Sequence, residues 1–325
     1  MAHPDASLAE HLAGFPELSP VILSIAVASR EIAAALAGGA LRGHLGGLGV
    51  ANVQGEDQQK MDVLADQILR RHLEGSGGVA AIASEEHEGI WLGSTGAPWL
   101  VAYDPLDGSS NLEVNISVGT IFSVRRAAPD PVTEADFLVP GREQVAAGYV
   151  LYGPSTTLAL TTGRGVHMFT LDPESGEYVC TRSHVEVPAC AQELAINVSN
   201  RRRWDPPVRR WVDEMFEGAD GPRGRDFNLR WIATLVAEVH RILTRGGVFS
   251  YPLDARLRAD GRAGRLRLVY ELAPMAMLLE QAGGAASDGC RPLSAVVPRS
   301  LHARAPAFLG ASDEVARVVR YHREA

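Results

Sequence analysis

Apolar segments of strand length that run directly into acidic residues are the feature that most constrains the fold of this chain. VAAIAS (79–84) is followed by Glu85-Glu86, and WLVAYD (99–104) continues into Pro-Leu-Asp. Short, continuous apolar runs of this kind predict buried strands. Each predicted strand therefore has carboxylates at its end.

Helical and strand-like segments alternate along the rest of the chain. The segments 19–37 and 57–73 are predicted helices, the first with Ser19 as a cap and Pro20 in its first turn. Further strands are predicted at 115–124, 148–162 and 165–172, and ELAINVS, GGVFSYP and LRLVYE are predicted strands of the second half. The segments 227–243 and APMAMLLEQAGG are predicted helices. This order indicates an α/β or α+β fold with layered helices and sheets.

The pattern loosens near residues 181–191, which predicts a boundary between an N-terminal domain, 1–187, and a C-terminal domain, 188–325. The length of 325 residues allows either one large or two moderate domains. We find no internal repeat and no low-complexity segment.

Composition excludes several classes of protein. The net charge of −8 argues against a general nucleic-acid or anionic-membrane binder. Three scattered cysteines do not make a disulfide framework or a thiolate metal site, and no HExxH motif suggests zinc. No secretory signal is visible at the N-terminus, and the apolar stretch VILSIAVA is too short to span a membrane. We therefore expect a soluble, cytoplasmic protein.

Acidic residues occur in four places at strand ends or beside a helix start. They are Glu56 with Asp62, Glu85 with Glu86, Asp104 with Asp107, and Glu271. Hard divalent cations such as Mg²⁺ bind carboxylate and carbonyl oxygens, and phosphate commonly completes their shell. In Asp-Pro-Leu-Asp the proline stiffens the turn, so both aspartates and the Leu106 carbonyl are able to face one site.

The tetrapeptide after Asp107 suits a phosphate. Gly108, Ser109, Ser110 and Asn111 offer backbone N–H groups and hydroxyls to phosphate oxygens. Each motif taken alone also has an ordinary structural interpretation: Asp-Gly is turn chemistry, and paired glutamates are typical of a solvated surface. Their recurrence at strand ends is what favours a metal and phosphate site.

In these blocks the chain resembles the class I fructose-1,6-bisphosphatases, of bacterial type. The resemblance rests on NVQGEDQQKMDVLAD, ASEEHE, DPLDGSSN with ISVGTIF, GYVLYGPST, LRWIATLVAEVHRIL and GRLRLVYELAPMAMLLEQAGG, and it covers nearly the whole chain. The shorter DPxDG-S/T-x-N signature is shared with the wider lithium-sensitive phosphatase superfamily, including inositol monophosphatases. Tyr270-Glu271 followed by Pro274 favours the sugar bisphosphatase branch.

The resemblance implies a role for each matching residue. It implies that the metal ligands are Glu85, Asp104, the Leu106 carbonyl, Asp107 and Glu271, and that the catalytic residues that activate water are Glu56, Asp62 and Glu86. It implies that the substrate is bound by Asp107, Gly108, Ser109, Ser110, Asn111, Asn197, Asn200, Tyr251 and Arg265, and by Arg230 donated from a neighbouring subunit. Most metal ligands then lie in domain 1–187, and domain 188–325 binds the sugar phosphate.

The same resemblance implies a layered αβαβα sandwich and a homotetramer. The implied activity is Mg²⁺-dependent hydrolysis of the 1-phosphate of fructose 1,6-bisphosphate in gluconeogenesis or the Calvin cycle, with two or three Mg²⁺ per subunit and Mn²⁺ as a substitute. A sedoheptulose-1,7-bisphosphatase or a dual-substrate enzyme is the alternative within this family. A non-catalytic regulatory homologue is a remote alternative, because every expected metal carboxylate is present.

A few positions depart from the common family pattern. Arg265 stands where a lysine is usual, and it is still able to hold a phosphate, with a planar fork in place of a point charge. Trp231 and Asn200 stand where some members have tyrosines. Trp231 has no hydroxyl, so we expect it to pack, whereas Asn200 keeps a hydrogen-bond donor.

Overall fold

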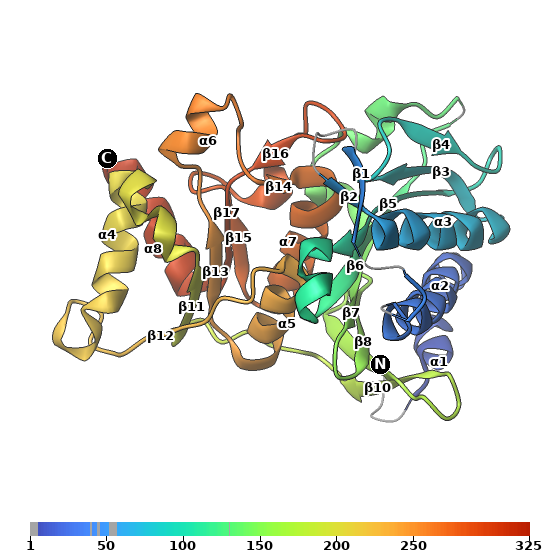
Figure 1. Ribbon diagram of the computed structural model, residues 1–325, viewed down its shortest axis with the longest axis horizontal. Helices are drawn as coiled ribbons and strands as arrows, with labels where there is room; N and C mark the ends of the chain where they lie inside the picture. Colours follow the sequence, from blue (N-terminus) through green and yellow to red (C-terminus); the bar gives the residue numbers. More distant parts are fainter. Residues whose placement is uncertain (1–5, 40, 44–45, 52–56, 130) are drawn as a thin grey trace.

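A computed structural model of the chain describes residues 6–39, 41–43, 46–51, 57–129 and 131–325. Helical layers alternate with two main sheets, in the order helix, sheet, helix, sheet, helix (Figure 1). The predicted αβαβα sandwich is therefore confirmed.

The first sheet has eight strands in the order β10-β9-β8-β7-β6-β5-β3-β4. Its strands are β3 (Val79–Ser84), β4 (Ile90–Leu92), β5 (Trp99–Asp107), β6 (Val118–Arg126), β7 (Gln144–Tyr152), β8 (Thr156–Thr161), β9 (Val166–Leu171) and β10 (Tyr178–Arg182). β3 and β5 are parallel, and the other neighbours are antiparallel. The predicted strand 148–162 is in fact the end of β7 and the whole of β8.

Two helices cover the outer face of this sheet. α2 (Ser19–Ala37) and α3 (Lys60–Gly75) pack on it together with the short α1 (Leu8–Leu12). Alternation along β6 sends Phe122 and Val124 to this face and Ile121 to the other. The small antiparallel pair β1 (Gly47–Ala51) and β2 (Asp57–Gln59) precedes α3, so this helix begins three residues later than predicted.

α2 confirms the bounds of the predicted helix 19–37, but the predicted cap was wrong, because the N-cap is Leu18 and Ser19 is the first residue of the helix with no capping hydrogen bond. By length and composition it is able to span a membrane, with 19 residues and a mean hydropathy of 1.6 over its most apolar window, which differs from the expectation based on VILSIAVA alone. In the structure, however, Val21, Ile22 and Ile25 are buried in the core beneath the first sheet. α2 is therefore placed as a core helix.

The second sheet has five strands in the order β12-β11-β13-β17-β15. They are β11 (Glu193–Ile196), β12 (Asn228–Leu229), β13 (Val248–Tyr251), β15 (Ala285–Ser287) and β17 (Ala307–Gly310). α4 (Pro206–Phe216) and α8 (Ser312–Glu324) cover its outer face, where Trp211 and Phe308 meet edge to face. The remaining short elements are α6 (Ala255–Ala259) and the two-stranded pair β14 (Leu266–Arg267) and β16 (Arg304–Ala305).

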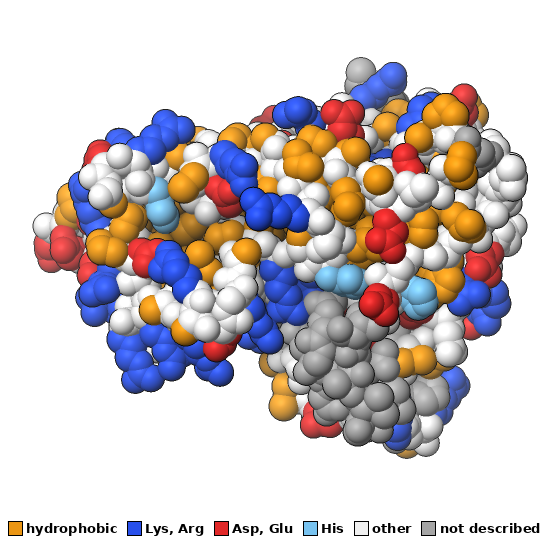
Figure 2. All heavy atoms as spheres, turned by 90° about the horizontal axis from the view of Figure 1, so that it is seen from above, with side chains coloured by type: hydrophobic (Ala, Val, Ile, Leu, Met, Phe, Trp, Pro, Cys, Tyr) orange, Lys and Arg blue, Asp and Glu red, His pale blue; other side chains and the backbone are white. Residues whose placement is uncertain are grey.

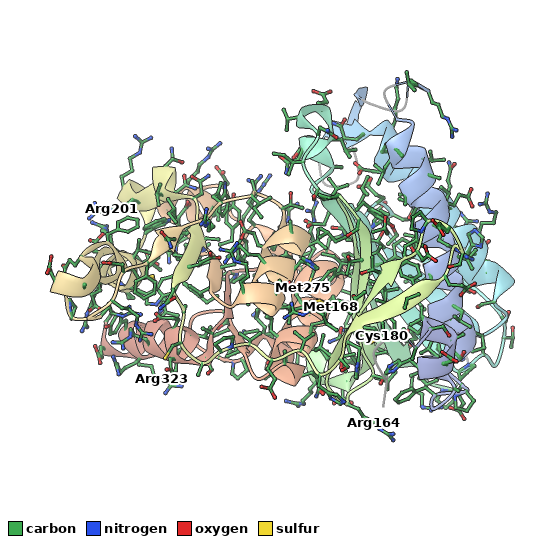
Figure 3. All side chains as sticks on the ribbon, turned by 90° about the horizontal axis from the view of Figure 1, so that it is seen from below. Arg164, Met168, Cys180, Arg201, Met275 and Arg323 are labelled. Atoms are coloured by element: carbon green, nitrogen blue, oxygen red, sulfur yellow. The ribbon has the colours of Figure 1, made fainter. Side chains whose placement is uncertain are left out.

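The middle layer consists of α5 (Leu235–Arg245) and α7 (Ala273–Gln281), packed between the sheets. Met168 of β9 and Met275 of α7 lie in this shared core (Figure 3). One apolar cluster thus joins the two halves of the chain, and both sheets end beside it.

Two predicted elements were wrong in this middle layer. The predicted helix 227–243 begins only at Leu235, because Ala233 has a φ of 65° that no α-helix contains. The predicted strand 266–271 is a two-residue strand followed by a single π-helical turn, Leu268–Leu272. Both corrections fall beside the pocket described next, and irregular turns of this kind are frequent at functional sites.

On the face of the molecule that Figure 2 shows, basic side chains are interspersed with acidic and apolar ones. Arg201, at the outer end of the second half (Figure 3), forms an ion pair with Asp213 at 2.7 Å.

Candidate active site

A pocket of about 570 Å³ opens where β5, the π turn before α7 and the second sheet meet. Predicted site residues from distant parts of the sequence line it together. They are Asp62, Glu85, Glu86, Asp104, Leu106, Asp107, Gly108, Ser109, Ser110, Asn111, Asn197, Tyr251, Arg265 and Glu271. Asn200 and Arg230 are not in its wall, and Glu56 lies outside the described residues.

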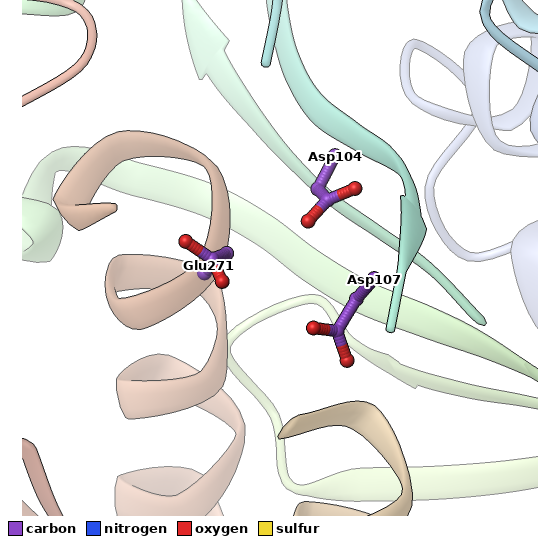
Figure 4. A group of neighbouring side chains, drawn as sticks. All are labelled: Asp104, Asp107 and Glu271. Atoms are coloured by element: carbon purple, nitrogen blue, oxygen red, sulfur yellow. The ribbon is translucent and has the colours of Figure 1, made fainter. Parts of the chain in front are cut away.

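Three carboxylates of the pocket wall lie close together, and we refer to Asp104, Asp107 and Glu271 as the carboxylate cluster. One oxygen from each lies within 4.8 Å of the others, and the side chains face a common space (Figure 4). All are buried, with exposed fractions of 6 %, 8 % and 2 %. Asp104 and Asp107 come from the end of β5, and Glu271 comes from the π turn.

Burial and mutual repulsion oppose ionisation of this cluster. Burial raises the pKa of Asp107 to about 6 and that of Glu271 to about 8. The pKa of Asp104 lies well above its ordinary value because of burial first, and then the charges of Glu85, Asp107 and Glu271. Like charges held this close need a cation, and an all-oxygen set of donors fits a hard divalent ion.

Backbone groups fix the two aspartates. The N–H of Leu106 donates to Asp104 at 2.9 Å, and the N–H of Val236 donates to Asp107 at 2.7 Å. Val236 is in the first turn of α5, so the positive end of that helix dipole faces the Asp107 carboxylate. The wrongly predicted start of this helix therefore matters, because only a helix that begins at Leu235 places its N-terminus here.

The turn after Asp107 requires a glycine. Gly108 has a φ of 83°, and a Cβ at this position would lie 2.4 Å from Cγ2 of Thr234. The amide of Asn111 donates to the Thr234 hydroxyl at 2.9 Å and to the Ala233 carbonyl at 3.2 Å. The Gly-Ser-Ser-Asn turn is thus fixed against the loop that precedes α5, with Ser109 and Ser110 in the pocket wall.

Asp62 lies at the start of α3, beside this turn. It accepts hydrogen bonds from the Ser109 hydroxyl at 3.0 Å and the Gln59 N–H at 3.2 Å. Burial raises its pKa to about 7 despite these bonds. Asp62 is therefore able to exchange a proton near neutral pH, which suits a group that acts on water.

Aromatic side chains and Arg265 form the opposite wall. Trp231 stacks on Phe249, with ring centroids 6.0 Å apart, and meets Tyr251 edge to face at 5.9 Å. This confirms the expectation that Trp231 packs. The Arg265 guanidinium lies over the Tyr251 ring at 5.4 Å, and the Asn197 oxygen accepts from the Ser199 hydroxyl at 2.6 Å.

Arg230 and Asn200 have other contacts. Arg230 is half exposed and lies 3.5 Å from Glu193, outside the pocket of its own chain. Asn200 accepts a hydrogen bond of 3.4 Å from Arg203.

Arg267 is the residue that sequence reasoning missed. Its guanidinium pairs with Glu85 and lies 3.9 Å from Glu271, and its own N–H donates to Glu271. It is a cation in direct contact with the acids. No local pattern in the sequence pointed to it, because its strand, β14, has only two residues, Leu266 and Arg267.

Comparisons with known proteins agree along the whole chain. The family model "Fructose-1-6-bisphosphatase, N-terminal domain" matches residues 6–183, and the corresponding C-terminal domain model matches residues 187–323. A class 1 fructose-1,6-bisphosphatase of Methylibium petroleiphilum is 52% identical over 318 residues, covering 95% of this chain and 90% of that protein.

Solved structures of Leishmania major fructose-1,6-bisphosphatase are similar in fold. The holo form has a TM-score of 0.92 at 32% identity and covers 99% of this chain and 100% of that one. The apo form has a TM-score of 0.86 at 29% identity, covering 98% and 99%.

Proposed function

The chain belongs to the class 1 fructose-1,6-bisphosphatase family, and we propose that it hydrolyses the 1-phosphate of fructose 1,6-bisphosphate to fructose 6-phosphate and inorganic phosphate. One observation carries the proposal. A single pocket joins a buried carboxylate cluster, a glycine-serine turn and a basic, aromatic wall. These parts suit, in that order, a divalent metal, a phosphate and a sugar phosphate.

The family implies a divalent metal cofactor, and we propose Mg²⁺, two or three per subunit, with Mn²⁺ as a substitute. Glu85, the carboxylate cluster and the Leu106 carbonyl would hold it. The repulsion that raises the pKa of the cluster carboxyls is the property that supports this assignment. Bound there, a divalent ion neutralises phosphate charge and lowers the pKa of water.

Other residues of the chain orient the phosphate, accept the proton of water and offset charge. Ser109, Ser110 and the backbone N–H groups of the turn donate hydrogen bonds to the 1-phosphate and orient it. Asp62 is bonded to Ser109 and has a pKa near 7, so it takes the proton of the attacking water, together with Glu86 and Glu56. Arg267 offsets the negative charge of Glu85 and Glu271 before the metal binds.

The opposite wall binds the other end of the substrate. Arg265 pairs with the 6-phosphate, while Asn197 and Tyr251 donate hydrogen bonds to the phosphate and sugar. Asn200 lies outside the pocket wall, so we give it no substrate contact here. Arg230 is outside the pocket of its own chain, and we propose that it completes the site of a neighbouring subunit in a homotetramer. Domain 1–187 then carries most metal ligands, and domain 188–325 the sugar-phosphate wall. We place the enzyme in the cytoplasm, in gluconeogenesis or the Calvin cycle.

Phosphate release tests this function. Wild type and Asp107→Ala are incubated with fructose 1,6-bisphosphate, with Mg²⁺ or with EDTA. We expect release by wild type that EDTA abolishes and that the variant lacks. A parallel reaction with sedoheptulose 1,7-bisphosphate compares the two sugars. No release from either sugar by a folded wild-type protein, with Mg²⁺ or Mn²⁺, would overturn the proposal.

A further inference from the structure

Arg125, at the end of β6, is a buried arginine without a counter-ion in the part of the chain that the structure describes. It is 3 % exposed, and its Nε and Nη1 atoms have no hydrogen-bond partner. Burial lowers its pKa to about 10, and no acidic residue opposes that shift. An unpaired buried charge is strongly unfavourable, so a group of this kind calls for a partner.

Two further polar atoms without partners share its face of the first sheet. Gln144 on β7 is the cross-strand neighbour of Arg125, and Ser123 lies two residues before Arg125 on β6. The Gln144 amide nitrogen donates to the carbonyls of Gly141 at 2.7 Å and Ala273 at 2.9 Å. These bonds fix the amide and leave its buried oxygen unpaired, as is the Ser123 hydroxyl.

Arg125 lines a second cavity of about 580 Å³, which shares no residue with the first pocket. Its other walls are residues 126–128 and part of the segment 135–143. This volume lies in the ordinary range for small-molecule sites. The cavity therefore has room for a metabolite beside the unpaired guanidinium.

The other charged groups of the cavity already have contacts within the chain. Arg126 pairs with Glu17 at 3.0 Å and lies over the Trp99 ring at 4.6 Å. Asp136 accepts a hydrogen bond from the Thr133 N–H at 2.7 Å, and Glu143 lies 3.8 Å from Arg142. Arg125 is left as the anion anchor, and the two acids disfavour a ligand with many negative charges.

We propose that the Arg125 cavity is a second ligand site, which binds a small molecule through one carboxylate or phosphate group. The planar guanidinium accommodates either oxyanion in a two-pronged hydrogen bond. This site is separate from the proposed active site and does not depend on the proposed function.

Thermal unfolding of the full chain tests the site. Wild type, Arg125→Met and the matched control Arg126→Met are heated in buffer free of oxyanions, and then with inorganic phosphate or with acetate, without metal. We expect the Tm of wild type and of Arg126→Met to rise by roughly 2–4 °C when a probe is at about ten times its dissociation constant. Arg125→Met should show a smaller rise, limited to what the probe gains by binding in the first pocket, and its Tm in the oxyanion-free buffer should not fall below that of wild type.

Comparison of the probes separates phosphate from carboxylate recognition. Arg125→Lys keeps the positive charge but loses the two-pronged hydrogen bond, so we expect its Tm to rise less than that of wild type. This variant serves as the test if Arg125→Met folds poorly. An equal rise in wild type and Arg125→Met would overturn the proposal. A wild-type Tm that does not change with either probe would also overturn it. This includes the case in which the Tm rises with protein concentration instead, because a carboxylate of a second copy fills the cavity.

Discussion

Two groups of buried charges lie near the middle layer and differ in how they are paired. The carboxylate cluster brings three acids together at the end of the first sheet. The second group, the arginine network, consists of Glu193, Glu238 and Arg241, where Arg241 lies 2.7 Å from Glu193 and 3.1 Å from Glu238. Burial opposes ionisation of Glu193, but the hydrogen bond and charge of Arg241 outweigh it, so the pKa of Glu193 lies below its ordinary value.

This difference separates structural charges from functional ones. In the network each buried acid has a basic partner within the chain, although burial still raises the pKa of Glu238, and the charges hold α5 against the second sheet. In the cluster the acids repel one another, and burial with repulsion raises their pKa values. Removing a charge should therefore damage stability in the network and activity in the cluster.

Glu271→Gln should give the largest effect on activity. The substitution keeps the size of the side chain but removes one charge from the cluster. Loss of a metal ligand removes several kcal/mol of transition-state stabilisation, which is roughly a 10³-fold fall in kcat/KM. Steady-state phosphate release measures it. The metal-free variant should unfold at the same temperature as wild type or higher, and a large loss of stability would contradict the comparison.

Arg241→Met should give the largest effect on stability. It leaves Glu238 buried without its basic partner and removes one of the basic partners of Glu193, which keeps Arg245 and Arg230; we expect a cost of about 3–5 kcal/mol in the free energy of unfolding. Urea unfolding measures this loss. The folded variant should keep a kcat within a few-fold of wild type, because the network lies outside the pocket wall. Unchanged stability would mean that the network is not structural.

The pH dependence of stability sharpens the same comparison. Asp62, Asp107 and Glu271 have folded-state pKa values of about 7, 6 and 8, above their ordinary values of 3.8, 3.8 and 4.5. The folded state thus binds protons more tightly than the unfolded state, and this stabilisation is lost as pH rises from about 4 to about 8.

Scanning calorimetry of the metal-free protein across that range tests the sign. We expect the Tm to fall with rising pH, and Mg²⁺ to restore it mainly at the upper end, where the carboxyls are ionised. The slope should be shallower in Glu271→Gln. If the metal-free protein becomes more stable towards pH 8, repulsion between the ionised carboxylates of the cluster does not destabilise the folded state.

Arg265→Lys should give the smallest effect. Lysine keeps the positive charge but loses the two-pronged hydrogen bond and the stacking on Tyr251. We expect KM for fructose 1,6-bisphosphate to rise less than about tenfold, with kcat nearly unchanged, since ~1.4 kcal/mol corresponds to tenfold. A large fall in kcat would move Arg265 from substrate binding to the chemical step.

The sequence was informative where local chemistry decides structure. Ser19 and Pro20 begin a helix at the predicted residue, and the proline between Asp104 and Asp107 predicts that both aspartates serve one site. Prediction failed where tertiary contacts override propensity. The sequence of residues 227–234 predicted a helix, yet Trp231 is in the pocket wall and Ala233 has a positive φ that a helix does not contain. The position of Arg267 beside Glu85 depends on the folded chain, so no local pattern gave it.

The central claim is that the carboxylate cluster is a cation site, and binding of Mn²⁺ to the metal-free protein tests it most directly. Titration calorimetry near pH 6.5, in buffers of different ionisation enthalpy, measures both affinity and released protons. We expect wild type and Asp66→Asn to bind Mn²⁺ and release protons, because Asp66 is a partly buried acid with a raised pKa outside the pocket wall. Asp107→Asn should bind far more weakly and release fewer protons. Equal binding and proton release by Asp107→Asn and wild type would contradict the account.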